Sequence, residues 1–235
     1  MSKARHTTQI NQHQPLTYTK FDAADVHIGY TGEKFHFDNE VPAHRYHQPA
    51  FSFANRLVTN AEYQAFILDG GYTKPELWLA DGWAWKESSH ATQPLYWRQQ
   101  EGAWNEYTLH GLLALDPELP VSHVNYYEAD AYARWVGKRL PSEQEWETVC
   151  QQHPSKTDVV SASLHPSVIG ADDGVLQLFG SLWQWTHSSY SPYPGYRAAK
   201  GAIGEYNGKF MCNQRVLKGG SCATPRAHLR PTYRN

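Results

Sequence analysis

The sequence predicts one α+β domain with few long regular elements. Three helix starts carry a capping box, in which Thr, Asn or Ser stands three residues before Glu. Short β-forming runs lie between them, separated by segments rich in Gly, Pro and aromatic residues. No linker-like segment divides the 235 residues into two self-sufficient cores. A single mixed domain therefore fits the pattern better than two domains.

The composition narrows the class of protein. A formal net charge of −2 argues against a protein that binds nucleic acid electrostatically. No apolar run reaches the roughly 18 residues of a membrane span, and the first residues have no hydrophobic signal segment. The three cysteines are widely spaced and form no CxxC pair. We therefore expect a protein of the reducing cytoplasm.

The elements are predicted in chain order, beginning with a polar segment. Residues 1–24 are read as a mobile lead-in and 25–235 as the domain. A strand is expected at VHIGY from Val26, and the alternation of Phe35 and Phe37 indicates another.

The three capped helices follow. Thr59 caps a helix over 60–69, and Asn125 caps one over 126–137. Ser142 opens the third. We expect the first two to pack on a small antiparallel sheet.

The remaining segments are irregular or strand-like. Residues 96–109 indicate a hairpin, and 176–186 form a strand-like aromatic run. Residues 190–201 contain Pro and Gly and are expected to be a loop, whereas 215–217 are β-forming.

The last twenty-one residues, 215–235, concentrate positive charge. Arg226, Arg230 and Arg234 recur at spacings of four after the flexible pair Gly219-Gly220. The guanidinium groups could hold neighbouring loops together, or they could form a rim that binds a carboxylate, since Arg presents a planar fork of donors. Both interpretations are compatible with the sequence.

Several long motifs carry a family resemblance. They are PVSHVNYYEADAYARWVGKRLPSEQEWE at 120–147, LFGSLWQWTHSSYSPYPGY at 178–196, GEYNGKFM at 204–211 and GGSCATPR at 219–226. From about residue 25 onward the chain resembles the formylglycine-generating-enzyme, or sulfatase-modifying-factor, superfamily, which has a C-type-lectin-like fold. It is most similar to the C-terminal domain of the iron-dependent sulfoxide synthases of ergothioneine biosynthesis.

The resemblance implies an activity and its partners. Those enzymes use oxygen and iron(II) to join a thiol, cysteine or γ-glutamylcysteine, to trimethylhistidine as a sulfoxide. The iron is held by three histidines of an N-terminal helical bundle that this chain lacks, and a closing strand after Asn235 is also missing. The isolated chain is therefore expected to be a truncated part that binds no iron tightly and is inactive.

Two alternatives stay open at this point. The chain could be a non-catalytic lectin-like binding module that uses the surface around 226–235. It could also be an enzyme subunit completed by a partner chain that carries the iron.

The resemblance assigns no catalytic residue here and suggests three substrate-binding residues. Arg230, Arg234 and Asn235 directly precede the residues that contact substrate in the family. Both substrates carry carboxylates that an Arg fork can bind. In the alternative interpretation, one or both guanidinium groups point inward and tie Gly219-Gly220 to the strand at 183–185.

Two metal sites known in the family can be placed on this sequence. The copper-binding cysteines of formylglycine-generating enzymes would fall on Thr224 and Leu229, which cannot act as thiolates, so that activity is rejected. Relatives also bind calcium near 180–185, where their carboxylate ligand falls on Gln184. A neutral donor there disfavours calcium without excluding it.

Histidines near the start offer one other metal site. Two histidines with a carboxylate can form an iron-binding facial triad, and His36, Asp38, His44 and His47 lie close in sequence. Prolines in this segment prevent a helix that would bring the rings to one face, so no metal ligand is assigned.

Overall fold

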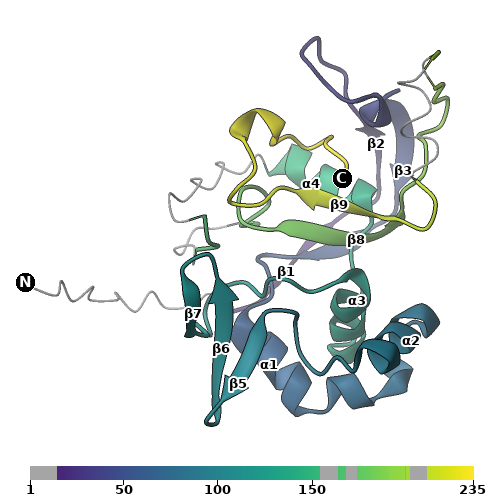
Figure 1. The fold of residues 1–235 in the computed structure, drawn as a ribbon. Coiled ribbons are helices and arrows are strands. Elements are labelled where there is room, and N and C mark those ends of the chain that lie inside the picture. The colour runs from purple at the N-terminus through teal and green to yellow at the C-terminus, as the bar shows by residue number, and fades with distance from the viewer. Residues whose placement is uncertain (1–14, 154–163, 168–173, 199, 202–210) are drawn as a thin grey trace, which may run out of the picture.

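The structure is a computed structural model that describes residues 15–153, 164–167, 174–198, 200–201 and 211–235. Figure 1 shows the arrangement of its elements. The strands are β1 Tyr18–Phe21, β2 Ala24–Ile28, β3 His44–Gln48, β4 Phe51–Ala54, β5 Trp97–Gln100, β6 Ala103–Thr108, β7 Gly111–Ala114, β8 Trp183–Ser189 and β9 Arg215–Gly219. The α-helices are α1 Asn60–Leu68, α2 Ala80–Ser89, α3 Tyr126–Trp135 and α4 Glu143–Gln152, and 3₁₀ turns lie at Asp38–Glu40, Gly71–Thr73, Pro75–Leu77 and Arg226–His228.

The strands form small antiparallel sheets. β1 pairs with β4, β2 with β3, and β8 with β9, while β5, β6 and β7 form a three-stranded meander. The predicted hairpin at 96–109 corresponds to β5 and β6, which turn at Glu101-Gly102. Mixed helix and strand content with small sheets confirms the predicted α+β class.

The ordered domain begins earlier than the predicted boundary at residue 25. β1 lies within the predicted lead-in. Phe21 of this strand is buried and stacks on Phe51 of β4 at a ring separation of 4.9 Å, so the strand is packed onto the domain. Residues 1–14 lie outside the described part. The strand expected around Phe35 is wrong: Phe35 is 72% exposed, and Phe37 instead precedes the turn Asp38–Glu40.

All three predicted helices are present with their capping boxes. In each, the side chain of Thr59, Asn125 or Ser142 accepts a hydrogen bond from the backbone N–H three residues on. The sequence did not predict α2. Leu79 stands at its N-cap and provides no side-chain acceptor, so the usual start signal is missing.

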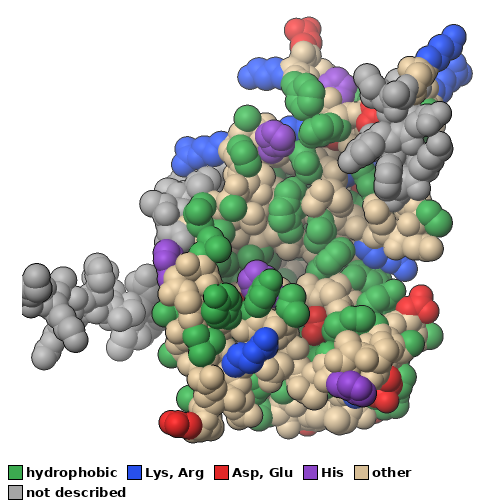
Figure 2. All heavy atoms as spheres, in the orientation of Figure 1, with side chains coloured by type: hydrophobic (Ala, Val, Ile, Leu, Met, Phe, Trp, Pro, Cys, Tyr) green, Lys and Arg blue, Asp and Glu red, His purple; other side chains and the backbone are tan. Residues whose placement is uncertain are grey.

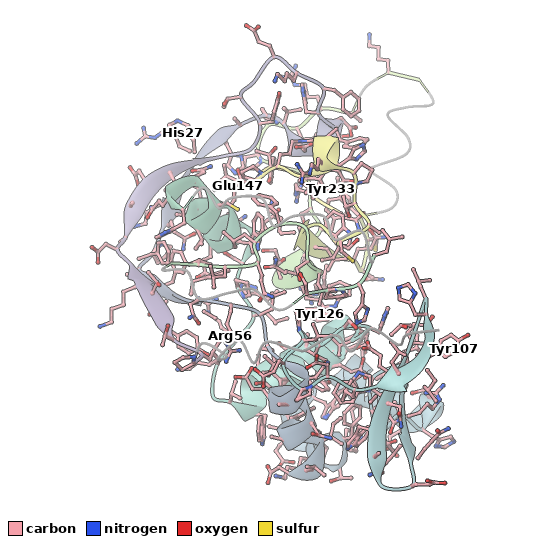
Figure 3. The ribbon with its side chains drawn as sticks, turned by 90° about the vertical axis from the view of Figure 1, so that its left-hand side faces the viewer. His27, Arg56, Tyr107, Tyr126, Glu147 and Tyr233 are labelled. Carbon is pink, nitrogen blue, oxygen red and sulfur yellow. The ribbon has the colours of Figure 1, made fainter. Side chains whose placement is uncertain are left out.

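Buried apolar side chains gather in two clusters. The aromatic cluster packs around α1 and α3, and the α4 cluster packs around α4 and the loop before β8. In Figure 3, Glu147 and Tyr233 lie in the half that contains α4, Tyr107 lies in the other half, and Arg56 lies near the junction. The aromatic cluster comprises Tyr63, Phe66, Tyr72, Trp78, Trp97, Ala131 and Tyr132. The α4 cluster comprises Phe21, Trp146, Val149, Cys150, Val175, Leu178 and Phe179.

The packing of α1 differs from the prediction. α3 contacts β8, as expected for a helix on a small sheet, but α1 packs on α3 and the turn Gly71–Thr73. The reason is chemical, since α1 directs Tyr63 and Phe66 toward Tyr132 of α3.

The surface carries charges of both signs. On the face in Figure 2, blue and red side chains are interspersed with hydrophobic ones. None of the helices in the described residues has the length and apolar character needed to cross a bilayer.

Candidate functional site

The C-terminal segment is fixed to the protein by buried ion pairs, and Arg230 makes the first of them. Its Nε donates to Glu40 Oε2 at 2.8 Å, and its Nη2 donates to Glu40 Oε1. The hydroxyl of Thr232 donates to the same carboxylate at 2.6 Å. Burial acts to raise the pKa of Glu40, but the hydrogen bonds from Arg230, the Phe37 N–H and Thr232 outweigh it, so the net pKa is lowered.

Arg234 makes the second ion pair and is almost completely buried. It donates to both oxygens of Glu143, from Nε at 2.7 Å and from Nη2 at 3.1 Å. The same guanidinium donates to the carbonyls of Asn39 at 2.9 Å and Ser191 at 2.8 Å. The protein therefore satisfies the donors of this fork on three sides.

Two aromatic rings hold the Arg234 guanidinium on its faces. The guanidinium carbon lies 4.1 Å from the centre of the Tyr193 ring and 4.9 Å from that of Tyr190. Burial raises the pKa of both phenols, which therefore stay neutral at physiological pH. The position of Arg234 is thus determined by both hydrogen bonds and stacking.

Lys218 and Glu147 form the third ion pair, and both side chains have no exposed surface. The ammonium lies 3.4 Å from Glu147 Oε2, and the other oxygen, Oε1, accepts from the Gly29 N–H at 2.8 Å. Burial raises the pKa of Glu147, and Lys218 opposes that shift. Three carboxylates and three cations thus join α4, β9, the turn Asp38–Glu40 and the C-terminal segment into one charged layer, the ion-pair layer.

Asn235 ends the segment as an exposed neighbour of β9. Its backbone N–H donates to the Leu217 carbonyl at 3.2 Å, and its carbonyl accepts from the Leu217 N–H at 2.9 Å. The structure thus places the three expected substrate residues differently, with Arg230 and Arg234 turned inward and Asn235 at the surface. The inward orientation was the alternative left open by the sequence, but the partners are Glu40 and Glu143 rather than the Gly219-Gly220 turn.

The copper position has no thiol. Thr224 accepts a hydrogen bond from the Ser221 N–H at 2.9 Å, and Leu229 packs against the α4 cluster. Cys222 is a buried free thiol whose pKa is raised by burial. This local arrangement is a turn with apolar packing.

The histidines near the start do not converge. His44 and His47 are three residues apart on β3, so their side chains leave opposite faces of the strand. The Nδ1 atom of His47 lies 2.9 Å from Asp25, whereas the His44 ring packs on Tyr193. Across the described residues, no three His, Cys, Asp or Glu side chains are grouped so that they could hold a metal ion.

The residues at the family's calcium position do not fit a cation. Gln184 Nε2 donates to the carbonyls of Gln177 at 2.8 Å and Leu178 at 3.1 Å, and its Oε1 accepts from Trp146 Nε1 at 2.8 Å. Calcium prefers oxygen ligands, including carboxylates. Here an N–H donor occupies the point where the carbonyl oxygens meet.

One local motif occurs twice and was not noticed in the sequence. It reads Arg-Leu-x-(Thr/Ser)-x-x-Glu, at 56–62 before and into α1 and at 139–145 before and into α4. In both copies the Arg fork binds the capping-box Glu at 2.6–2.9 Å and donates to the carbonyl of the following Leu. A search for internal repeats could have found it.

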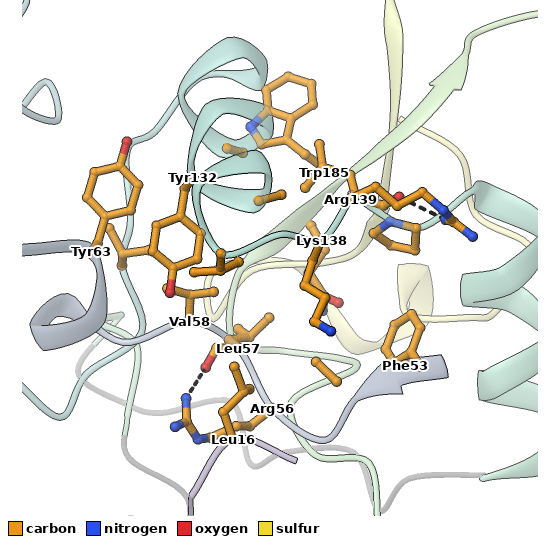
Figure 4. A pocket seen from close by; sticks show the side chains of 18 of the residues that line it. Leu16, Phe53, Arg56, Leu57, Val58, Tyr63, Tyr132, Lys138, Arg139 and Trp185 are labelled. Atoms are coloured by element: carbon orange, nitrogen blue, oxygen red, sulfur yellow. Dashed lines mark hydrogen bonds between the residues drawn. The ribbon is translucent and has the colours of Figure 1, made fainter. Parts of the chain in front are cut away.

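A cavity of about 580 Å³ lies between these two copies. β1, β4, α3 and β8 also contribute to its largely apolar lining. Figure 4 shows Lys138 extending into it between Leu57 and Phe53. Neither Arg230, Arg234 nor Asn235 lines it, so the cavity and the C-terminal segment are separate places.

The chain is similar in sequence to several known proteins. A family model for the sulfatase-modifying factor enzyme 1-like domain matches residues 18–158, more than half of the chain. A hercynine oxygenase of Mycobacterium tuberculosis is 36% identical over 91% of this chain and 53% of its own length. Ergothioneine biosynthesis protein 1 of Schizosaccharomyces pombe is 30% identical over 87% of this chain and 26% of its own length. The chain spans about half the length of the hercynine oxygenases that it matches.

The chain is also similar to two more distant proteins. A formylglycine-generating enzyme of Streptomyces coelicolor is 28% identical over 81% of this chain and 73% of its own length. The solved structure of PvdO from Pseudomonas aeruginosa is 19% identical, with a TM-score of 0.48 over 93% of this chain and 87% of that one. The family model spans more than half of the chain and therefore shows the family. The chain belongs to the family of sulfatase-modifying factor enzyme 1-like domains and has the formylglycine-generating-enzyme-like fold.

Proposed function

We propose that this chain is the C-terminal, substrate-pocket-forming part of an ergothioneine-type sulfoxide synthase. The observation that carries the proposal is the 36% identity to a hercynine oxygenase across 91% of the chain. The residues at the copper position support it, because Thr224 and Leu229 provide no thiolate for formylglycine-generating chemistry. The proposed reaction joins a thiol, cysteine or γ-glutamylcysteine, to trimethylhistidine in the cytoplasm and gives a sulfoxide.

The proposal needs a second part, in cis or as a partner chain. Iron(II) held there would supply the activation of oxygen. In this chain, the ion-pair layer would hold the C-terminal segment against α4 and β9, with Asn235 exposed beside Leu217 of β9. A rigid support of this kind favours the precise placement of substrate groups.

We propose distinct roles for the three C-terminal residues. Asn235 is the candidate for direct contact with a substrate, since the residue is exposed. Arg230 retains an exposed edge of 14% beside Glu40, so its guanidinium can add to the positive potential there. Arg234 acts as a positioning residue through Glu143.

The test reconstitutes the two parts. The 235-residue chain is incubated aerobically with iron(II), trimethylhistidine and either thiol, with and without the three-histidine domain encoded upstream in frame or in a neighbouring gene. We expect sulfoxide, detected by mass spectrometry, only when both parts are present. Product from the chain alone would contradict the proposed division of labour.

A negative result would also distinguish the proposed synthase part from a binding module. If the neighbouring coding sequence holds no such domain, and a domain from a hercynine oxygenase restores no turnover, the chain functions as a binding module instead. The same preparation would then be titrated with each thiol and with trimethylhistidine by calorimetry. Binding without turnover would replace the present proposal with that alternative.

A further inference from the structure

The side chain of Gln184 is the centre of a closed hydrogen-bond arrangement. Its amide nitrogen donates to two backbone carbonyls of the loop before β8, those of Gln177 and Leu178. Its oxygen accepts from the indole N–H of Trp146 on α4. Both the nitrogen and the oxygen of the Gln184 amide are therefore hydrogen-bonded, and the loop folds around this group.

The backbone of β9 closes over the same point. Gly219 has a φ of +94°, and a Cβ there would stand 2.7 Å from the Leu178 carbonyl oxygen and 3.1 Å from Gln184 Nε2. The Leu182 carbonyl oxygen would lie 3.6 Å from that Cβ. Backbone oxygens from the loop thus gather around the amide nitrogen, and only glycine allows β9 to approach so closely.

The charges around this point leave a cation without a counter-charge. The groups that contact Gln184, the indole of Trp146 and two carbonyls, are neutral. Lys218 is the cross-strand neighbour of Gln184, so the two side chains leave the same face of the sheet. The buried carboxylate of Glu147 is matched by Lys218. A divalent cation would therefore meet neutral oxygens and a nearby ammonium group.

We propose that the Gln184 amide takes the place of a bound cation and organises the loop Gln177–Leu182 without a metal ion. The positive end of the amide dipole, its N–H pair, does for the carbonyl oxygens what a cation would do. The chain should then fold without calcium, and one atom-for-atom exchange, Gln184→Glu, should create a cation site. In that variant a carboxylate oxygen would face the Gln177 and Leu178 carbonyls, which repel it unless a cation bridges them. The added negative charge would also offset the Lys218 ammonium, which disfavours a cation in the wild type.

The test measures the melting temperature of the full 235-residue chain in EDTA and in millimolar calcium. We expect the same Tm for the wild type in both. Gln184→Glu should melt several degrees lower in EDTA and recover a large part of the loss in calcium, because a ligand that binds only the folded state raises its stability. Gln99→Glu, the same exchange at an exposed position of β5, should show no calcium effect.

Two results would overturn the proposal. One is a wild-type Tm that rises in calcium, and the other is a folded Gln184→Glu variant that ignores calcium. If Gln184→Glu does not fold, two other measurements test the proposal. One is calorimetric titration of the wild type with calcium chloride, and the other is the stability of Gln184→Met, which keeps the size of the side chain but loses both hydrogen-bonding ends. A saturable wild-type site contradicts the proposal, whereas no binding and a destabilised Gln184→Met variant support it.

Discussion

Each of the two copies of the Arg-Leu-x-(Thr/Ser)-x-x-Glu motif begins an α-helix, but the two helices bury different kinds of side chain. In both, an Arg fork binds the capping-box Glu, and burial, which acts to raise the pKa of Glu62 and Glu145, is outweighed by hydrogen bonds led by that Arg, so the net pKa is lowered. After the first copy, α1 buries the rings of Tyr63 and Phe66. After the second, α4 buries the carboxylates of Glu143 and Glu147 beside its apolar residues.

The difference shows that helix initiation and core chemistry are encoded separately. The cap is a local pattern of seven residues, and it does not determine which side chains the helix will bury. The aromatic cluster of the first half consists largely of stacked and edge-on rings, whose contacts tolerate small adjustments. The interior of the second half needs each charge to meet its partner, since an unmatched buried charge is costly.

Breaking an ion pair should therefore have the largest effect. Lys218→Met leaves the Glu147 carboxylate buried and unmatched, and we expect a loss of about 3–5 kcal/mol in the free energy of unfolding, measured by urea denaturation. The double variant Lys218→Met with Glu147→Gln removes both charges and should lose less than the single one. A single variant as stable as the wild type would show that the ion-pair layer contributes little.

The next largest effect is expected when the guanidinium fork of Arg234 is lost but its positive charge is kept. Arg234→Lys keeps the cation but loses the two-pronged contact to Glu143 and the carbonyl contacts, so we expect a loss of about 2–3 kcal/mol. Thermal unfolding measures it, and Arg226→Lys on the exposed 3₁₀ turn is the matched control. In a reconstituted active enzyme, a raised KM with unchanged stability would instead assign Arg234 to substrate binding.

The caps and the ion-pair layer also differ in how far the sequence could predict them. Thr59, Asn125 and Ser142 were identified because a cap and its Glu stand three residues apart. Arg234 and Glu143 are 91 residues apart, and Arg230 and Glu40 are 190 apart. No local pattern links such partners, so the sequence left both orientations of the arginines open.

Acid should weaken the ion pair between Arg230 and Glu40. The pKa of Glu40 is lowered below its ordinary 4.5 in the folded protein, so its contribution to stability is present above about pH 4.5 and is lost as the pH falls through the lower folded value. Denaturant unfolding between pH 6 and pH 3 should show this loss. Glu40→Gln should be less stable at pH 6 and lose less on acidification, and equal slopes for both proteins would refute the assignment to Glu40.

The smallest effect tests whether the two motif copies are equivalent as caps. Thr59→Ala and Ser142→Ala each remove one side-chain acceptor from a helix N-terminus, and each should cost about 1 kcal/mol. Equal losses are expected because the cap bonds close locally, whatever the helix buries. The arginines should differ, since the side chain of Arg56 is 7% exposed and that of Arg139 is 59% exposed. Arg56→Lys should therefore lower the Tm more than Arg139→Lys, and the reverse order would mean that the cavity between the copies relaxes around Arg56.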